Sequence, residues 1–322
     1  MKTYFSTASE RASMGKLSTT QGTIDRDEIG LLVPHEHIFA DLGPMEAENW
    51  KDTDPEAVIE LIGPEIERAK EAGIDALVEC TPEGVGRRVD IDLAVSEATD
   101  FPVVVPTGIY QETSIPQWAR EMGVAELTEW MLDELTNEIE DTGVRAAWIK
   151  VSTDDDDPEG LSDDEEKILR AAARAGAETG AVIGSHTLHG NVAHQQLDII
   201  AEEGYDPSRF IWIHARAEEN LDYHERAAKR GAFVEYDWIG GHDQDDQTYI
   251  DLVEYMTERG YTDNILLSQD RGYYDPSQPD GGEVDPYTYI VEKFLPKLRA
   301  ANVPDAAIDT IVHENPLDAY CR

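Results

Sequence analysis

Cysteine and long apolar runs are both scarce in this 322-residue sequence. It contains only Cys80 and Cys321, too few for a disulfide-stapled secreted fold, and this usage fits a reducing compartment. No segment approaches the roughly 20 apolar residues that a membrane-spanning helix needs. No apolar stretch lies between the early basic residues Lys2, Arg11 and Lys16, so a secretory signal is not recognisable. We therefore expect a cytoplasmic protein that does not associate with membranes.

Basic residues are also scarce, because 26 Lys and Arg stand against 68 Asp and Glu, giving a formal net charge of −42. Such a charge repels nucleic acid and anionic membranes, which bind clustered Lys and Arg. Disorder is the first alternative for so acidic a chain, but 40% of the residues are hydrophobic and 13 are tyrosines. The acidic residues are better interpreted as a coat on a folded protein. A coat of this kind is typical of proteins in molar salt, so a halophilic cytoplasm is our hypothesis.

Eight short apolar or β-branched runs recur along the chain and predict β-strands. They cover residues 31–34, 74–79, 103–106, 146–151, 181–185, 210–213, 232–236 and 265–268. Between them lie helix-like segments such as 54–72, 124–142, 163–179, 192–203, 218–230 and 248–259, several of them ending at a glycine. Alternating strands and helices predict parallel strands with right-handed crossovers, and eight such units close a barrel. We therefore predict an α/β fold, a single-domain (β/α)8 TIM barrel over residues 1–322, with about 20 residues of N-terminal extension.

Residue types that bind metals stand at the ends of five of these runs. They are His35 and His37 after GLLVP, Lys150 after AAWI, His186 after AVIGS, His214 after FIWI and Asp270 after NILLSQ. Barrel active sites form at the carboxyl ends of the strands, so these side chains are expected to converge. His35 and His37 share one face of a strand and can chelate one ion, whereas Glu36 points away. Imidazole and carboxylate suit zinc, manganese, iron or cobalt.

Each of these residues also has a structural explanation. A lone His-x-His pair is a weak signal, and a strand lysine such as Lys150 often forms a salt bridge at the end of a barrel. In a chain with 68 acidic residues, a single Asp is usually a solvated surface group. The joint placement at strand ends is what favours a metal site.

The chain resembles the phosphotriesterase family of the amidohydrolase superfamily, including its lactonase branch. The matching segments run from about residue 20 to about residue 320: Gly22-Thr23-Ile24, Gly30 leading to His35-Glu36-His37, Thr107-Gly108-Ile109-Tyr110, Trp148-Ile149-Lys150-Val151, Ser185-His186-Thr187, Ile213-His214, Ser268-Gln269-Asp270 and Glu314-Asn315-Pro316. No single segment is specific, but the set is.

The resemblance implies a barrel with two divalent metal ions, zinc first among the candidates. His35, His37 and Asp270 would hold one ion, His186 and His214 the other, and Lys150 would bridge them after carboxylation by carbon dioxide. A carbamate is a carboxylate on a long stem, whereas an ammonium cannot bind a cation. A hydroxide shared by the ions would attack an ester or lactone carbonyl, and Asp270 would take its proton.

Substrate residues are predicted less directly. Tyr110 matches a tyrosine near the metals of lactonase-type relatives, or it fills the barrel rim. Arg216 and Arg271 follow predicted ligands and would bind a substrate anion or pair with nearby acids. They favour a sugar lactone, with a phosphotriesterase or carboxylesterase as the alternative. Asp237 and His242 are further candidates, whereas we expect His189, His194, His224 and His313 to be structural or on the surface.

Two other classes of function stay open. One is a catalytically inactive barrel that binds a metal or ligand, although such a descendant would have no need of Lys150. The other is a metal-free enzyme with a phosphate-binding rim, for which Gly240-Gly241 and Gly281-Gly282 are in place. By analogy with the family, a homodimer with a small-molecule substrate is expected.

Overall fold

Parallel strands surround the centre of the molecule, a computed structural model that describes residues 15–44, 47–241 and 245–322. The barrel strands are β3 (Leu32–Phe39), β4 (Ala76–Glu79), β5 (Val103–Val104) with β6 (Pro106–Gly108), β7 (Trp148–Ser152), β8 (Ile183–His186), β9 (Phe210–Ile213), β10 (Phe233–Tyr236) and β11 (Ile265–Leu267). One sheet runs from β6 to β11 in order, and a second joins β5, β4 and β3. The predicted (β/α)8 barrel is confirmed.

The barrel closes where β11 meets β3. The backbone N–H of Asp270 donates to the carbonyl of His35 (3.1 Å), and the short strand β12 (Gly272–Tyr274) pairs with the end of β3, opposite His37 and Phe39. This extra pairing makes β3 longer than the predicted strand 31–34. His35 and His37 therefore lie within a hydrogen-bonded strand, on which their side chains were expected to share one face.

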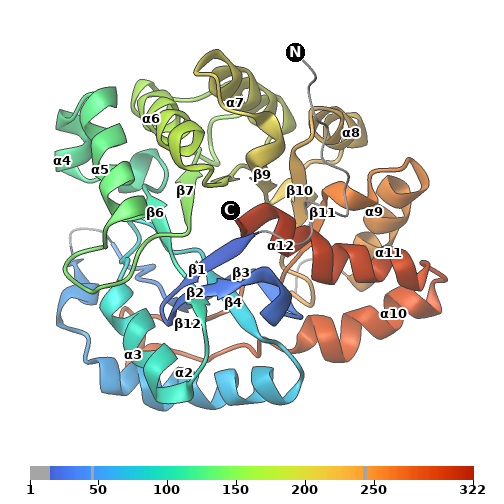
Figure 1. Cartoon of the computed structure of the whole chain (residues 1–322), viewed down its shortest axis with the longest axis horizontal. Helices are drawn as coiled ribbons and strands as arrows, with labels where there is room; N and C mark the ends of the chain where they lie inside the picture. The colour runs from blue at the N-terminus through green and yellow to red at the C-terminus, as the bar shows by residue number, and fades with distance from the viewer. Residues whose placement is uncertain (1–14, 45–46, 242–244) are drawn as a thin grey trace.

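Helices follow the strands and cover the outside of the barrel, as Figure 1 shows. They are α2 (Pro55–Glu71), α3 (Val89–Thr99), α4 (Gln117–Glu121), α5 (Val124–Thr136), α6 (Asp163–Thr179), α7 (Gly190–Glu202), α8 (Leu221–Lys229), α9 (Asp246–Glu258), α10 (Leu295–Ala300), α11 (Asp305–Asp309) and α12 (Asn315–Tyr320). α6 matches its predicted bounds because both ends are capped, by Ser162 bonded to Glu165 N and by Gly180 at φ 77°. α5 ends six residues before the predicted 142, since the chain turns back with Ile139 N bonded to Val144 O.

The apolar core has two layers, one between strands and helices and one inside the barrel. Trp148 fills the interior, where Gly184 leaves it room: a Cβ on Gly184 would lie 2.7 Å from the Trp148 ring. The floor is closed by α12 and by the hairpin of β1 (Lys16–Thr19) and β2 (Gly22–Asp25), which lie over the middle of the barrel in Figure 1. Tyr320 packs edge-on against Trp148 (5.4 Å) and donates to Pro34 O. This packing leaves the other end of the barrel for a site.

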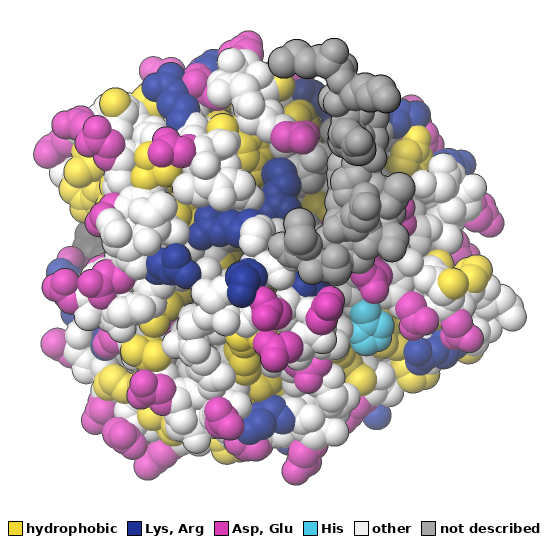
Figure 2. Space-filling model, viewed as in Figure 1, with side chains coloured by type: hydrophobic (Ala, Val, Ile, Leu, Met, Phe, Trp, Pro, Cys, Tyr) yellow, Lys and Arg dark blue, Asp and Glu magenta, His cyan; other side chains and the backbone are white. Residues whose placement is uncertain are grey.

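Acidic side chains are spread over the face seen in Figure 2, while several Lys and Arg side chains gather near its middle. The acidic residues thus lie on the surface of a folded protein, as the sequence predicts. No helix among the described residues is long and apolar enough to cross a membrane.

Candidate active site

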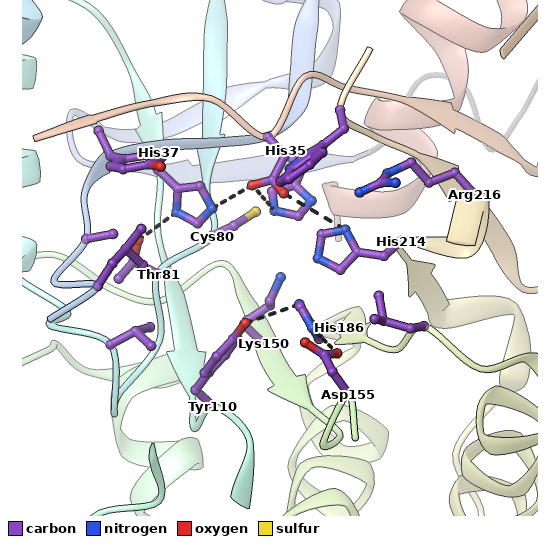
Figure 3. A pocket seen from close by; sticks show the side chains of 17 residues that line it. His35, His37, Cys80, Thr81, Tyr110, Lys150, Asp155, His186, His214 and Arg216 are labelled. Carbon is purple, nitrogen blue, oxygen red and sulfur yellow. Dashed lines mark hydrogen bonds and ion pairs between the residues drawn. The ribbon is translucent and has the colours of Figure 1, made fainter. Parts of the chain in front are cut away.

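A cavity of about 370 Å³ opens at the carboxyl ends of the barrel strands (Figure 3). Its wall contains every predicted metal ligand together with Tyr110 and Arg216. The complete lining is His35, His37, Ala40, Leu42, Cys80, Thr81, Val85, Tyr110, Lys150, Asp155, His186, Leu188, His214, Arg216, Trp238, Asp270 and Tyr273. Glu36 is not part of it, as predicted; instead its carboxylate accepts hydrogen bonds from Gln269 and Arg271 N behind the site.

The first group of candidate ligands consists of His35, His37 and Asp270. Asp270 Oδ1 lies 3.1 Å from His37 Nε2 and 3.3 Å from His35 Nε2. One donor atom from each residue falls within 4.8 Å of the others, a spacing that can hold an ion. Asp270 has a left-handed backbone (φ 52°), a conformation that costs energy and is common at functional sites.

The far nitrogens of both imidazoles contact side-chain oxygens, which fixes the orientation of the two rings. His35 Nδ1 lies 2.6 Å from Glu235 Oε1, and His37 Nδ1 lies 2.7 Å from Thr81 Oγ1. The Thr81 hydroxyl donates a hydrogen bond to Phe39 O, so its oxygen must accept a hydrogen bond from His37 Nδ1–H. Carboxylates and hydroxyls hold metal-binding histidines in this way. Both Nε2 atoms are thereby turned toward Asp270 Oδ1 at the cavity.

The second group contains His186 and His214, whose ring centroids are 4.3 Å apart. His214 has φ 64°, and its backbone N–H donates to Asp237 Oδ2 (2.8 Å). Its Nδ1 lies 2.8 Å from Asp237 Oδ1 but without hydrogen-bond geometry, so this buried nitrogen has no hydrogen-bond partner among the described residues. His186 Nε2 contacts Asp155 Oδ1 (2.7 Å), and its Nδ1 faces the Tyr110 hydroxyl (3.3 Å).

Lys150 lies between the two groups, and its side chain is 2% exposed (Figure 3). Its neighbours in register on β6 and β8 are Gly108 and Gly184. A Cβ on Gly108, whose φ is 118°, would fall 1.9 Å from Lys150 O, so the backbone approach at this point requires glycine. No hydrogen bond or ion pair reaches Lys150 Nζ from the part of the chain that the structure describes. An unpaired buried ammonium is costly.

Electrostatics keep the acids ionised and one histidine neutral. Burial alone would raise the pKa of Asp270, but His35, His37 and His214 hold that pKa well below its usual value. Burial likewise opposes ionisation of Asp237, yet His214 and Arg216 lower its pKa to about 2. Burial and the nearby His214 lower the pKa of His186 to about 4. At neutral pH the cavity thus presents carboxylates and an unprotonated imidazole, the forms that bind cations.

The predicted substrate residues fall in different places. Tyr110 reaches into the cavity beside His186, and burial raises the pKa of its hydroxyl, so it stays protonated and can donate. Arg216 is on the wall, with Nε 3.0 Å from Asp237 Oδ1 and its guanidinium over the Trp238 ring (4.6 Å). Arg271 does not line the cavity, and its guanidinium forms an ion pair with Asp285 at 3.6 Å. His242 lies outside the described residues.

Several residues of the site were not singled out from the sequence. Glu235 and Thr81 are buried behind the first group, Asp155 touches His186, and the apolar side chains of Leu42 and Trp238 stand at the cavity wall. Glu235 lies inside β10, so a search for polar residues inside strands would have found it, whereas Thr81 lies two residues beyond the end of β4. Asp155 sits in the acidic run 154–157, and nothing in the sequence separates it from its three neighbours.

The donor set fits divalent metal ions. Four imidazoles, the carboxylates of Asp155 and Asp270, and one buried lysine share a single cavity. Nitrogen and oxygen ligands of this kind suit zinc and its neighbours in the first transition row. The metal-binding prediction is therefore compatible with the geometry of both groups.

Comparisons with known proteins agree on one family. The model of the phosphotriesterase family matches residues 15–320. A phosphotriesterase homology protein of Mycobacterium tuberculosis is 30% identical over 331 residues, covering 96% of this chain and 98% of that protein. An aryldialkylphosphatase of Saccharolobus solfataricus is 28% identical over 91% of this chain and 96% of its own length, and an N-acetyltaurine hydrolase of Danio rerio is 24% identical over 94% and 97%.

The solved structure of the phosphotriesterase from Mycobacterium tuberculosis has a similar fold. It superposes with a TM-score of 0.84 at 28% identity and covers 95% of this chain and 98% of that one.

Proposed function

This chain belongs to the phosphotriesterase family, and from that premise we propose that it is a two-metal hydrolase whose preferred substrates are lactones. The observation that carries the proposal is the convergence of His35 Nε2, His37 Nε2 and Asp270 Oδ1 on one point of a cavity that Lys150, His186 and His214 complete. His35, His37 and Asp270 would hold one ion, and His186 and His214 would hold the other. A carboxylated Lys150 would bind both ions.

Bound ions of this kind activate a water molecule at neutral pH and polarise the oxygen of the bond under attack. Asp270 is the proton acceptor, because its low pKa keeps it ionised and it lies at the cavity wall. It takes a proton from the attacking water as the new C–O bond forms. It returns the proton to the ring oxygen that leaves when the lactone C–O bond breaks, which gives a hydroxy acid.

Tyr110 supports a lactone as the substrate. Its hydroxyl stays protonated and faces His186 Nδ1, so it lies close enough to the second group to donate a hydrogen bond to a substrate oxygen. A hydrogen bond of this kind contributes most when it strengthens as negative charge develops on that oxygen.

Arg216 supports a polar or anionic lactone, such as a sugar lactone, over one with a long alkyl chain. Its guanidinium is on the cavity wall, held in place by Asp237 and by stacking on Trp238. A planar guanidinium in a fixed position suits a carboxylate, a phosphate or a pair of hydroxyls.

The second candidate is phosphotriester hydrolysis, and the apolar part of the cavity favours it. Leu42 (59% exposed) and Trp238 (39% exposed) both line the cavity and would pack against an aryl leaving group. A phosphotriester carries no anionic group, so it would leave Arg216 unused.

A panel of substrates separates these candidates. Initial rates in molar potassium chloride, with zinc or manganese and with or without chelator, are compared for sugar γ-lactones, an acyl-homoserine lactone and an aryl phosphotriester. The proposal predicts chelator-sensitive hydrolysis, fastest for the sugar lactones. A faster rate with the phosphotriester would replace the lactonase assignment by the second candidate, and hydrolysis that resists exhaustive chelation would overturn the two-metal mechanism.

The acidic coat supports a halophilic cytoplasm as the setting. A net charge of −42 is self-repulsive in dilute buffer and is screened at molar salt. The protein is expected to lose its near-UV circular dichroism on dialysis into dilute buffer and to keep it in molar potassium chloride. An unchanged spectrum in dilute buffer would contradict this setting.

A further inference from the structure

The loop after β7 approaches the second group of candidate ligands through one carboxylate. Asp155 Oδ1 lies 2.7 Å from His186 Nε2, whereas Asp154 and Asp157 accept hydrogen bonds only from backbone N–H groups two residues further along the loop. Asp155 is also the single member of the acidic run 154–157 in the cavity wall. Figure 3 shows its carboxylate below the His186 ring.

Hydrogen bonds to neighbouring residues hold the loop in the conformation that places Asp155 next to His186. The backbone carbonyl of Asp155 accepts a hydrogen bond from His189 Nε2 (3.0 Å), the residue just before α7. Further along, Asn191 and Gln195 of α7 donate to Pro158 O and Glu159 O. At the start of the loop, Thr153 N donates to His186 O (2.9 Å). One loop therefore holds both the backbone and the ring of His186.

This contact determines which nitrogen of His186 faces the cavity. An ionised carboxylate only accepts hydrogen bonds, so His186 carries its proton on Nε2 and donates from there to Asp155 Oδ1. Nδ1 is then the nitrogen with the free lone pair, and it can accept from the Tyr110 hydroxyl at 3.3 Å. A metal-binding histidine is typically oriented by a carboxylate on its other nitrogen.

We propose that Asp155 is a positioning residue of the second ion: by holding His186 Nε2 it directs Nδ1 into the cavity and so sets the affinity of that ion. The proposal rests on the proposed two-metal function. Glu235 has the corresponding role for His35 in the first group, but it lies on a barrel strand and is fully buried, whereas Asp155 is 37% exposed on a loop. The second ion is thus the one whose binding depends on the loop after β7.

The test measures metal binding rather than turnover. Metal-free wild type, Asp155→Ala and Asp155→Asn are titrated with Zn²⁺ by calorimetry, and bound metal is counted after dialysis. Asp156→Ala is the matched control, because its exposed side chain makes no hydrogen bond within the described loop. Near-UV circular dichroism and the midpoint of thermal unfolding check that the variants fold.

Asp155→Ala is expected to bind the first ion as wild type does and the second about 10–100-fold more weakly. Asp155→Asn should recover part of this loss, because an amide oxygen still accepts from Nε2–H. Asp156→Ala should match wild type.

Three results would overturn the proposal. The affinity for the second ion could be unchanged in Asp155→Ala, the affinities for both ions could fall equally, or Asp155→Asn could bind the second ion no more tightly than Asp155→Ala. Failure of the proposed function is a different result, since wild type itself would then bind fewer than two ions.

Discussion

On one side of the cavity, His35 and His37 are held by side chains that are buried on or beside barrel strands; on the other side, His186 is held by an acid from a loop. Glu235 and Thr81 are 0% and 2% exposed, and β3 is itself paired on both edges. Asp155 is 37% exposed. A ligand that is positioned from buried strands loses little freedom when an ion binds, whereas a loop contact is weakened by solvent and salt.

If the barrel binds two ions as proposed, this difference predicts that their affinities are unequal. The three donor atoms of the first group lie within 4.8 Å of one another. His186 belongs to no comparable group among the described His, Cys, Asp and Glu residues. Lys150 stands between the groups, and its modification would join them.

The largest effect is expected from removing the residue common to both sides. Lys150→Met keeps the length and the burial of the stem but cannot be carboxylated. We predict that kcat/KM falls on the order of 10³-fold, about 4 kcal/mol, and that both ions bind more weakly. Lactone hydrolysis and metal counting on the same preparation would check this, and a variant that keeps wild-type activity would exclude the bridge.

A large but different effect is expected from Asp270→Asn. The amide can still contact His35 and His37 but cannot accept a proton, so kcat should fall about 10²–10³-fold. The second ion should be unaffected. Steady-state kinetics with a sugar lactone, paired with zinc titration, would check this; unchanged kcat would remove Asp270 as the proton acceptor.

Glu235→Gln is the counterpart of the Asp155 variants on the buried side. Glu235 Oε1 lies 2.6 Å from His35 Nδ1, and its Oε2 is buried without a hydrogen-bond partner among the described residues. The amide still accepts from Nδ1–H but lacks the charge, so the first ion should bind roughly tenfold more weakly and the second unchanged. Calorimetric titration would show it. If the affinity for the second ion fell instead, the two groups of ligands would not be positioned independently.

The last prediction concerns stability and a histidine outside the site, His224, which is buried and bonded to Tyr236 and Glu218 O. Burial lowers its pKa from 6.5 to about 4. The unfolded chain therefore takes up a proton between about pH 6.5 and about pH 4 while the folded chain does not, and stability falls as the pH drops through this window.

We expect a loss of about 2 kcal/mol from this group between about pH 7 and about pH 5. The loss should be absent in His224→Gln. Urea unfolding of the metal-free protein at both pH values would measure it, and equal pH dependence of wild type and variant would contradict it. The contribution of His224 must be subtracted before any pH dependence of stability is assigned to the ligands in the cavity.

Much of the fold could be predicted from the sequence because the strands are short apolar runs that end in polar residues. His35, Lys150, His186, His214 and Asp270 were found by their place at the ends of such runs. The break of the third strand at Val105 and the pairing of β12 with β3 could not be predicted, since both depend on hydrogen bonds between segments far apart in the chain.

The residues that orient the ligands were harder to find. Burial distinguishes Glu235 from the other acids, and a contact distinguishes Asp155 from Asp154, Asp156 and Asp157; neither property is visible in a chain with 68 acidic residues. Arg271 illustrates the converse, because its position next to Asp270 suggested a substrate contact while its side chain lies outside the cavity wall.

The most direct test of the account is a titration of the metal-free protein with Zn²⁺ in molar potassium chloride, with heat and lactone hydrolysis recorded at each step. The account predicts two ions per chain with distinct affinities, and hydrolysis that rises with the second. Full hydrolysis in the metal-free protein, or activity that saturates with a single ion, would contradict it.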